Sequence, residues 1–88
     1  MQALRESGVY RLSGVGDLVA HAVFRGGYFL YTPEAWEFNG LHKYESDADG
    51  RMRLNGRTTA WQIDQLTDTG RTARARSRSG AAQKAFID

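Results

Sequence analysis

The chain has 88 residues, no cysteine, and a formal charge of +2 from 12 basic and 10 acidic side chains. This length allows one domain with a small core and excludes a large multi-substrate enzyme. The absence of cysteine excludes disulfide bonds, thiolate zinc sites and a cysteine nucleophile.

Charged residues and large apolar side chains are unevenly distributed along the chain. Residues 1–69 carry seven basic and nine acidic side chains, whereas residues 70–88 carry five basic side chains and one acidic side chain. Between Gly70 and Ala85 no apolar residue is larger than alanine, so this part supplies little to a core. We therefore predict a small β domain over 1–69 and a basic C-terminal tail over 70–88.

The first third of the chain is predicted to form three strands. Apolar and polar side chains alternate over residues 9–13, and turn-forming residues follow from Ser13 to Asp17. The second and third strands are expected over Leu18–Arg25 and Tyr28–Thr32.

A tight hairpin is predicted between the second and third strands. Gly26-Gly27 suits a two-residue loop. This register pairs Ala22 with Tyr31 and also pairs Phe24 with Phe29, which sets two aromatic rings opposite each other. Because both faces of the hairpin are then largely apolar, we expect it to be central in a barrel or at an oligomer interface.

The segment after the third strand has the signals of a helix N-terminus. Thr32 is positioned as the N-cap, Pro33 occupies the first helical position, and Glu34 places an acid in the first turn. We predict a short helix over Pro33–Phe38 that ends at Asn39-Gly40. The alternative is a β-hairpin centred on Asn39-Gly40, and we favour the helix.

Three further strands are expected in the middle of the chain, over Leu41–Ser46, Arg51–Leu54 and Arg57–Trp61. Asn55-Gly56 would join the last two by a tight primed turn, because glycine and asparagine tolerate a positive φ. This part of the sheet is therefore predicted to form a meander.

Charge selects the register of the hairpin that precedes Arg51. A two-residue Asp49-Gly50 turn would set Glu45 opposite Leu54, whereas a three-residue loop sets Glu45 opposite Arg53. The second register separates apolar from charged residues and allows ion pairs, so we predict it. Its facing pairs are Asp47 with Arg51, Glu45 with Arg53, and Tyr44 with Leu54.

The last element before the tail is predicted to be a short helix. Residues 59–62 are compatible with a capping box, and Ile63 and Leu66 would lie on the inner face of a helix ending near residues 68–70. The complete pattern predicts a mainly β fold. It is a small meandering antiparallel sheet or an SH3-like barrel with one or two short helices.

The acidic loop and the two histidines are weak candidates for a metal site. Residues 47–50 resemble the start of a calcium loop, but Gly56 stands where the bidentate glutamate would be needed. His21 and His42 have no partner at a metal-binding spacing. A hairpin turn explains the acidic residues, and we expect no metal and no cofactor.

A small ribonuclease is a third hypothesis, which rests on residues near the middle of the chain. Residues 42–45 adjoin the strand of Arg51 and Arg53 and include a base, an acid and cations, the types that such enzymes set around phosphorus. Strand alternation would, however, point His42 away from Glu45. We therefore favour a protein without catalytic residues over an enzyme.

The arginine-rich segment over residues 71–79 is the main candidate for function. In an extended chain its alternate arginines share one side, where they can follow a nucleic-acid backbone and release counterions. We predict a non-enzymatic module that binds nucleic acid or another polyanion; an acidic protein surface is the alternative partner. The predicted nucleic-acid-binding residues are Arg71, Arg74, Arg76, Arg78 and Lys84.

Exposed aromatic residues support a second function. Aromatic side chains are more numerous than a small barrel easily hides, and they either stack on bases or are buried in a homodimer. The second hypothesis is a homo-oligomeric interaction module whose C-terminus docks on a neighbouring subunit. The predicted interface residues are Trp36, Phe38, Trp61, Phe86 and Ile87.

Two absences decide the expected location. The sequence has no run of about 18 apolar residues, the length that a membrane-spanning helix requires. Its start, MQALRESG, has no apolar stretch typical of a signal peptide. We therefore expect a cytoplasmic protein with no membrane partner.

Overall fold

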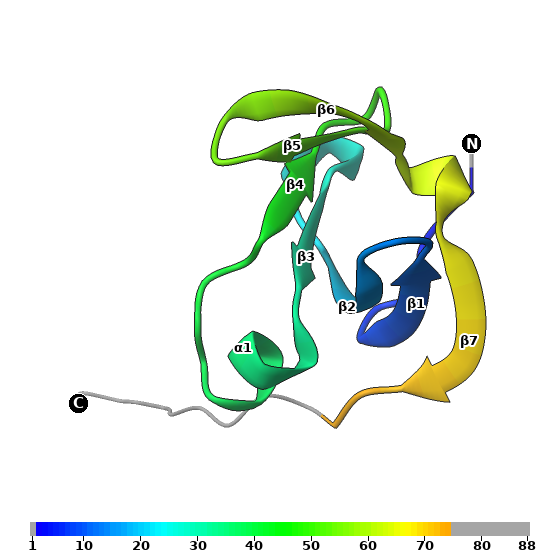
Figure 1. Cartoon of the computed structure of the whole chain (residues 1–88), viewed down its shortest axis with the longest axis vertical. Coiled ribbons are helices and arrows are strands. Elements are labelled where there is room, and N and C mark those ends of the chain that lie inside the picture. The colour runs from blue at the N-terminus through cyan, green and yellow to red at the C-terminus, as the bar shows by residue number, and fades with distance from the viewer. Residues whose placement is uncertain (1, 75–88) are drawn as a thin grey trace.

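The computed structural model describes residues 2–74, which form seven strands, one α-helix and two single 3-10 turns. The strands pair in the order β6-β5-β4-β3-β2-β1-β7 (Figure 1). The elements are β1 (Gly8–Leu12), β2 (Gly16–Ala22), η1 (Phe24–Gly26), β3 (Tyr28–Tyr31), α1 (Pro33–Glu37), β4 (Tyr44–Ser46), β5 (Arg51–Leu54), β6 (Arg57–Gln62), η2 (Ile63–Gln65) and β7 (Thr67–Thr72).

The strand order confirms the predicted mainly β fold and its meandering antiparallel sheet. Strands β1 to β6 are neighbours in chain order, and β7 returns to the free side of β1. Within the described residues β6 and β7 are the two edges, so the sheet is curled but does not close into a barrel.

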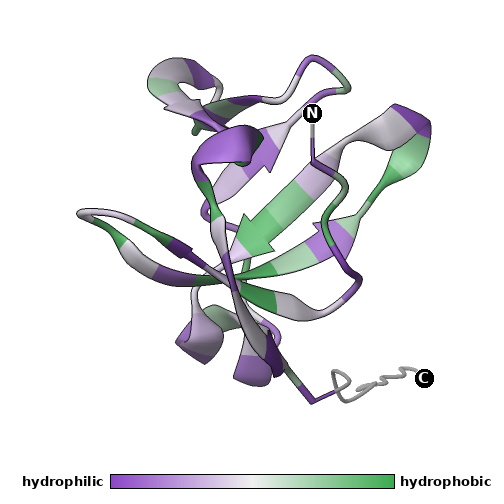
Figure 2. Cartoon of the chain, turned by 90° about the vertical axis from the view of Figure 1, so that its right-hand side faces the viewer, coloured by the Kyte–Doolittle hydropathy of each residue, from purple (hydrophilic) through white to green (hydrophobic). Residues whose placement is uncertain are grey.

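The inner face of the sheet holds the main core. Hydrophobic and hydrophilic bands alternate along the strands in Figure 2, as expected when one face of each strand is buried. Leu18 and Leu30 are completely buried, and Ile63 and Leu66 close the core from the segment around η2. The buried members of this cluster are Leu4, Tyr10, Leu12, Leu18, Ala20, Leu30, Tyr44, Met52, Ile63 and Leu66.

A second, smaller cluster lies on the outer face. Val9 of β1, Val19 of β2 and Tyr31 of β3 point to this side, and Trp36 of α1 packs over them. The ring of Trp36 meets that of Tyr31 edge to face at 5.3 Å between centroids. The short helix therefore covers only part of an apolar sheet face.

The predicted register between the second and third strands is wrong. Ala22 faces Tyr28 rather than Tyr31, and Phe24 lies outside the ladder in η1, where it is 87% exposed. Arg25 takes a φ of 63° inside a longer loop, which the N–H of Val23 closes on the carbonyl of Gly27 at 3.0 Å.

The physical reason is the close approach of β4 to the start of β3. A Cβ at Gly27 would overlap the carbonyl oxygen of Ser46, so this glycine is needed for strand packing. Gly27 is therefore the extended residue immediately before β3 and not part of a two-residue turn.

The predicted helix over residues 33–38 is confirmed, and the alternative hairpin does not form. The hydroxyl oxygen of Thr32 accepts a hydrogen bond from the N–H of Ala35 at 3.1 Å, and Pro33 opens the helix. The helix stops where Asn39 takes a φ of 57° and Gly40 N–H donates to the Ala35 carbonyl at 2.7 Å.

The charge-based register of the β4–β5 hairpin is confirmed. Glu45 faces Arg53, and Tyr44 faces Leu54. The ion pairs differ from the simple cross-strand picture, because Arg53 pairs with Asp47 at 3.0 Å. The primed turn at Asn55-Gly56 is also confirmed, with φ values of 52° and 80°.

The segment before the tail folds differently from the prediction. The helix is a single 3-10 turn, and its capping box joins Gln62 to Gln65. Residues 67–72 then form β7, in which Asp68 faces Tyr10 and Thr72 faces Gly8. Pairing supplies hydrogen bonds to the otherwise free edge of β1, so a polar sequence without apolar alternation becomes a strand. The predicted boundary after residue 69 lies within this strand.

Candidate functional site

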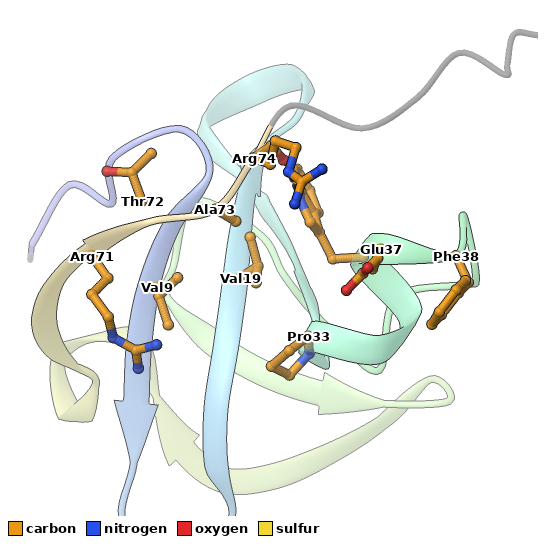
Figure 3. A pocket seen from close by; sticks show the side chains of 10 residues that line it. Val9, Val19, Pro33, Glu37, Phe38, Arg71, Thr72, Ala73 and Arg74 are labelled. Atoms are coloured by element: carbon orange, nitrogen blue, oxygen red, sulfur yellow. Dashed lines mark hydrogen bonds between the residues drawn. The ribbon is translucent and has the colours of Figure 1, made fainter.

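A groove of 890 Å³ opens on the outer face between α1 and residues 71–74 (Figure 3). This volume lies within the ~300–1,000 Å³ typical of small-molecule sites. The groove is lined by Val9, Val19, Pro33, Trp36, Glu37, Phe38, Arg71, Thr72, Ala73 and Arg74.

The groove exists because α1 is too short to cover the whole outer face. The helix contacts β2 and β3, and Trp36 and Ala73 nearly bury Val9 of β1 and Val19 of β2 at the bottom of the groove. Residues 71–74, at and just after the end of β7, form the opposite wall. The result is a groove with exposed charged residues on its walls and nearly buried valines beneath them.

Hydrogen bonds hold this opposite wall in position. The indole N–H of Trp36 donates to the carbonyl of Arg74 at 2.7 Å, from a side chain that is only 6% exposed. The N–H of Ala73 donates to the carbonyl of Ser7 at 2.7 Å. The backbone after β7 is therefore anchored both to the helix and to the N-terminal segment.

Asp17 neutralises part of the positive charge at the groove. Its carboxylate accepts a hydrogen bond from Arg71 at 2.6 Å and another from Arg11 at 3.0 Å. These bonds, first that of Arg71 and then that of Arg11, lower the pKa of Asp17. Arg71 is thus already paired, while within residues 2–74 no carboxylate forms an ion pair with Arg74.

A second ion pair ties β7 to the N-terminal segment. Arg5 donates to both carboxylate oxygens of Asp68, at 2.7 and 3.0 Å, and also to the hydroxyl of Thr72. The hydrogen bond from Arg5, followed by that from the Gly70 N–H, lowers the pKa of Asp68. This bidentate pair positions the strand that carries the groove wall.

The structure brings four predicted residues to this one groove. Arg71 and Arg74 lie on one wall, and Trp36 and Phe38 lie on the other. Trp61 is elsewhere, edge to face with Tyr44 beside the main core. The predicted residues Arg76, Arg78, Lys84, Phe86 and Ile87 lie outside the described residues.

The residues considered for a nuclease form a different arrangement from the one predicted. His42 does not point away from Glu45, because β4 begins at Tyr44 and His42 lies in the loop before it. Its Nε2 is 3.1 Å from Glu45 Oε1, and its ring stacks on Phe29 at 3.8 Å. Arg53 meanwhile pairs with Asp47.

A second histidine–glutamate pair, His21 with Glu6, connects β2 to the N-terminal segment. His21 Nδ1 lies 2.7 Å from one oxygen of Glu6, and the N–H of Ala22 donates to the other at 2.9 Å. Burial alone would raise the pKa of Glu6, but these two hydrogen bonds outweigh it, so the pKa is lowered. This histidine therefore has a structural partner.

Residues 2–74 contain neither a cluster of metal ligands nor a membrane-spanning helix. No group of three or more His, Cys, Asp or Glu side chains there is arranged to hold a metal ion. Within the same residues no helix is long and apolar enough to cross a membrane.

Sequence patterns did not point to several residues of the groove. Val9 and Val19 look like ordinary strand residues, and Glu37 looks like an ordinary solvated acid. Asp17 is 54 positions away from Arg71, so no local signal connects the two.

Comparisons of the chain with protein-family models, curated proteins and solved structures found no match. The groove, its charges and its exposed side chains are therefore the basis for assigning a function.

Proposed function

We propose that this protein is a non-enzymatic module that binds nucleic acid or another polyanion through the basic segment that begins at Arg71. Arg74 is the observation that carries this proposal. It lies at the rim of the groove, pairs with no carboxylate of residues 2–74, and is followed in the sequence by Arg76, Arg78 and Lys84.

The distribution of charge supports this assignment. Residues 2–74 carry nine basic and nine acidic side chains, so their formal charge is zero. Residues 75–88 carry three basic side chains and one acidic side chain, which accounts for the whole net charge of +2. A polyanion is therefore attracted to the end of the chain that follows the groove.

Some arginines of the folded domain already have carboxylate partners, whereas Arg74 has none within residues 2–74. Arg5, Arg53 and Arg71 each have a carboxylate partner within 3.0 Å. A phosphate would have to compete with these carboxylates, whereas at Arg74 it would not. Within residues 2–74 four other cations also form no ion pair, namely Arg25, Lys43, Arg51 and Arg57. Only Arg74, however, is followed within four positions by two further arginines.

Binding to a labelled oligonucleotide over a salt series tests the proposal in the full-length protein. Replacing both Arg76 and Arg78 by glutamine removes two cations, and we expect the slope of log K against log salt to fall by about two. The matched control replaces Arg25 and Arg57, two exposed arginines outside the groove, by glutamine. Equal slopes for the two double variants, or no binding by the wild type, would contradict the proposal.

A second candidate function is a homo-oligomeric interaction module. Phe38 and Leu41 favour it, because they are three positions apart in the connection after α1 and are 77% and 87% exposed. Light scattering of the wild type and of Leu41→Ser tests this function. It requires an oligomer that the substitution weakens, and a monomeric wild type would argue against it.

A further inference from the structure

We infer that the groove between α1 and residues 71–74 binds an unpaired nucleobase, so that the module prefers single-stranded over duplex nucleic acid. This inference rests on the proposed function and names its substrate class. It is carried by the charge layout of the groove and by one exposed aromatic ring.

The two walls of the groove differ in chemistry. Arg71 and Arg74 lie on the wall formed by residues 71–74, Glu37 projects from α1, and Phe38 follows it at the helix end, on the side of α1 away from Arg71 (Figure 3). A phosphate is attracted to Arg74, which forms no ion pair within residues 2–74, and is repelled by Glu37. A bound nucleotide is therefore oriented with its phosphate toward residues 71–74 and its base toward α1.

Phe38 supplies a surface on which a base can stack. Its side chain is 77% exposed, while its N–H donates to the carbonyl of Glu34 at 3.0 Å and so fixes the backbone. Stacking between a base and an aromatic ring is a common source of affinity for single strands and tolerates any base. In a duplex the bases are already stacked and paired, so they do not reach Phe38.

The lining of the groove suits the same ligand. Its exposed apolar side chains are Pro33 and Phe38, because Val9 and Val19 beneath them are only 7% and 2% exposed, and the volume of 890 Å³ is within the range of small-molecule sites. The indole of Trp36 lines the α1 wall, where its N–H donates to the carbonyl of Arg74. The combination of cations and an exposed aromatic ring is the pattern expected for single-strand binding.

The test compares three probes on the full-length protein: a short single-stranded oligonucleotide, the duplex of the same sequence, and inorganic polyphosphate. The variant is Phe38→Ala, and the matched control is Phe24→Ala, whose ring is 87% exposed but lies outside the groove. We expect Phe38→Ala to weaken single-strand binding about tenfold, while duplex and polyphosphate binding are unchanged. Phe24→Ala should behave as the wild type does with all three probes.

The outcomes separate this inference from the function on which it rests. If the wild type binds all three probes equally, or if the two alanine variants lose single-strand affinity equally, the base-binding site is overturned while polyanion binding stands. If no probe binds, both are overturned. Light scattering is measured in parallel, and a change of mass in Phe38→Ala would assign the loss to assembly and overturn the base-binding site.

Discussion

The two faces of the sheet differ in how completely they are covered. On the inner face Leu18, Leu30 and Met52 are fully buried, because the curled sheet and the η2 segment surround them. On the outer face Trp36 and Val9 are nearly buried, but a five-residue helix leaves the groove open beside them. The comparison indicates that stability depends mainly on the inner face, and that the outer face remains accessible to a ligand.

Ion pairs lie beside both faces. Asp17 pairs with Arg71 at the outer groove, whereas Asp68 pairs with Arg5 next to Tyr10 of the inner cluster. The inner cluster consists of aliphatic, tyrosine and methionine side chains.

The strongest test of this comparison removes the same side chain from a buried and an exposed position. Leu30→Ala should lower the free energy of unfolding by about 3 kcal/mol, because it deletes a completely buried side chain and leaves a cavity. Leu41→Ala, at an 87% exposed position, should change it by less than about 0.5 kcal/mol. Urea denaturation measures both, and similar losses would show that burial does not distinguish the two sites.

A second test releases the groove wall from the helix. Trp36→Phe removes the N–H that donates to the Arg74 carbonyl, so we expect a loss of about 1 kcal/mol and faster hydrogen exchange at the Ala73 amide. Trp61→Phe is the matched control, because Trp61 lies outside the groove, and it should leave exchange at Ala73 unchanged. Unaltered exchange in Trp36→Phe would mean that this bond does not position the wall.

The smallest effect expected is a dependence on acid pH at the outer face. The pKa of Asp17 is lowered in the folded state, so its stabilising contribution is present above its ordinary pKa of about 4 and is lost as pH falls through the lowered value. The difference in Tm between wild type and Asp17→Asn should therefore be larger at about pH 7 than at about pH 3. Thermal unfolding at both pH values measures this difference in Tm. An equal difference at the two pH values would show that the charge of the Asp17 carboxylate does not cause it.

Local patterns were sufficient to predict several elements. The helix after Thr32 and the turn at Asn55-Gly56 depend on residues close in sequence, and both formed as predicted. The register that sets Glu45 opposite Arg53 also followed from the charges of one hairpin. These predictions succeeded because the interacting groups are separated by few residues.

Long-range packing explains the predictions that failed. Gly27 was interpreted as part of a turn, but its lack of a side chain serves the close approach of Ser46 in β4. The polar segment 67–72 was expected to be a helix end and a tail, but it pairs with β1. Neither requirement is visible in the neighbouring residues.

At the candidate site, too, the sequence indicated the residues but not their long-range contacts. Arg71, Arg74, Trp36 and Phe38 were each selected from the sequence, and the structure places all four on one groove. The sequence could not show that Arg71 is already paired, because its partner Asp17 lies on a distant turn.

By itself the sequence determined the charge asymmetry, the absence of cysteine chemistry, and the elements that short-range capping and turn geometry specify. Only the tertiary structure decided that β7 completes the free edge of β1 and that α1 leaves the outer groove open. The physical reason is that backbone hydrogen bonds and ion pairs depend on distance in space, which the folded sheet sets between residues far apart in the chain.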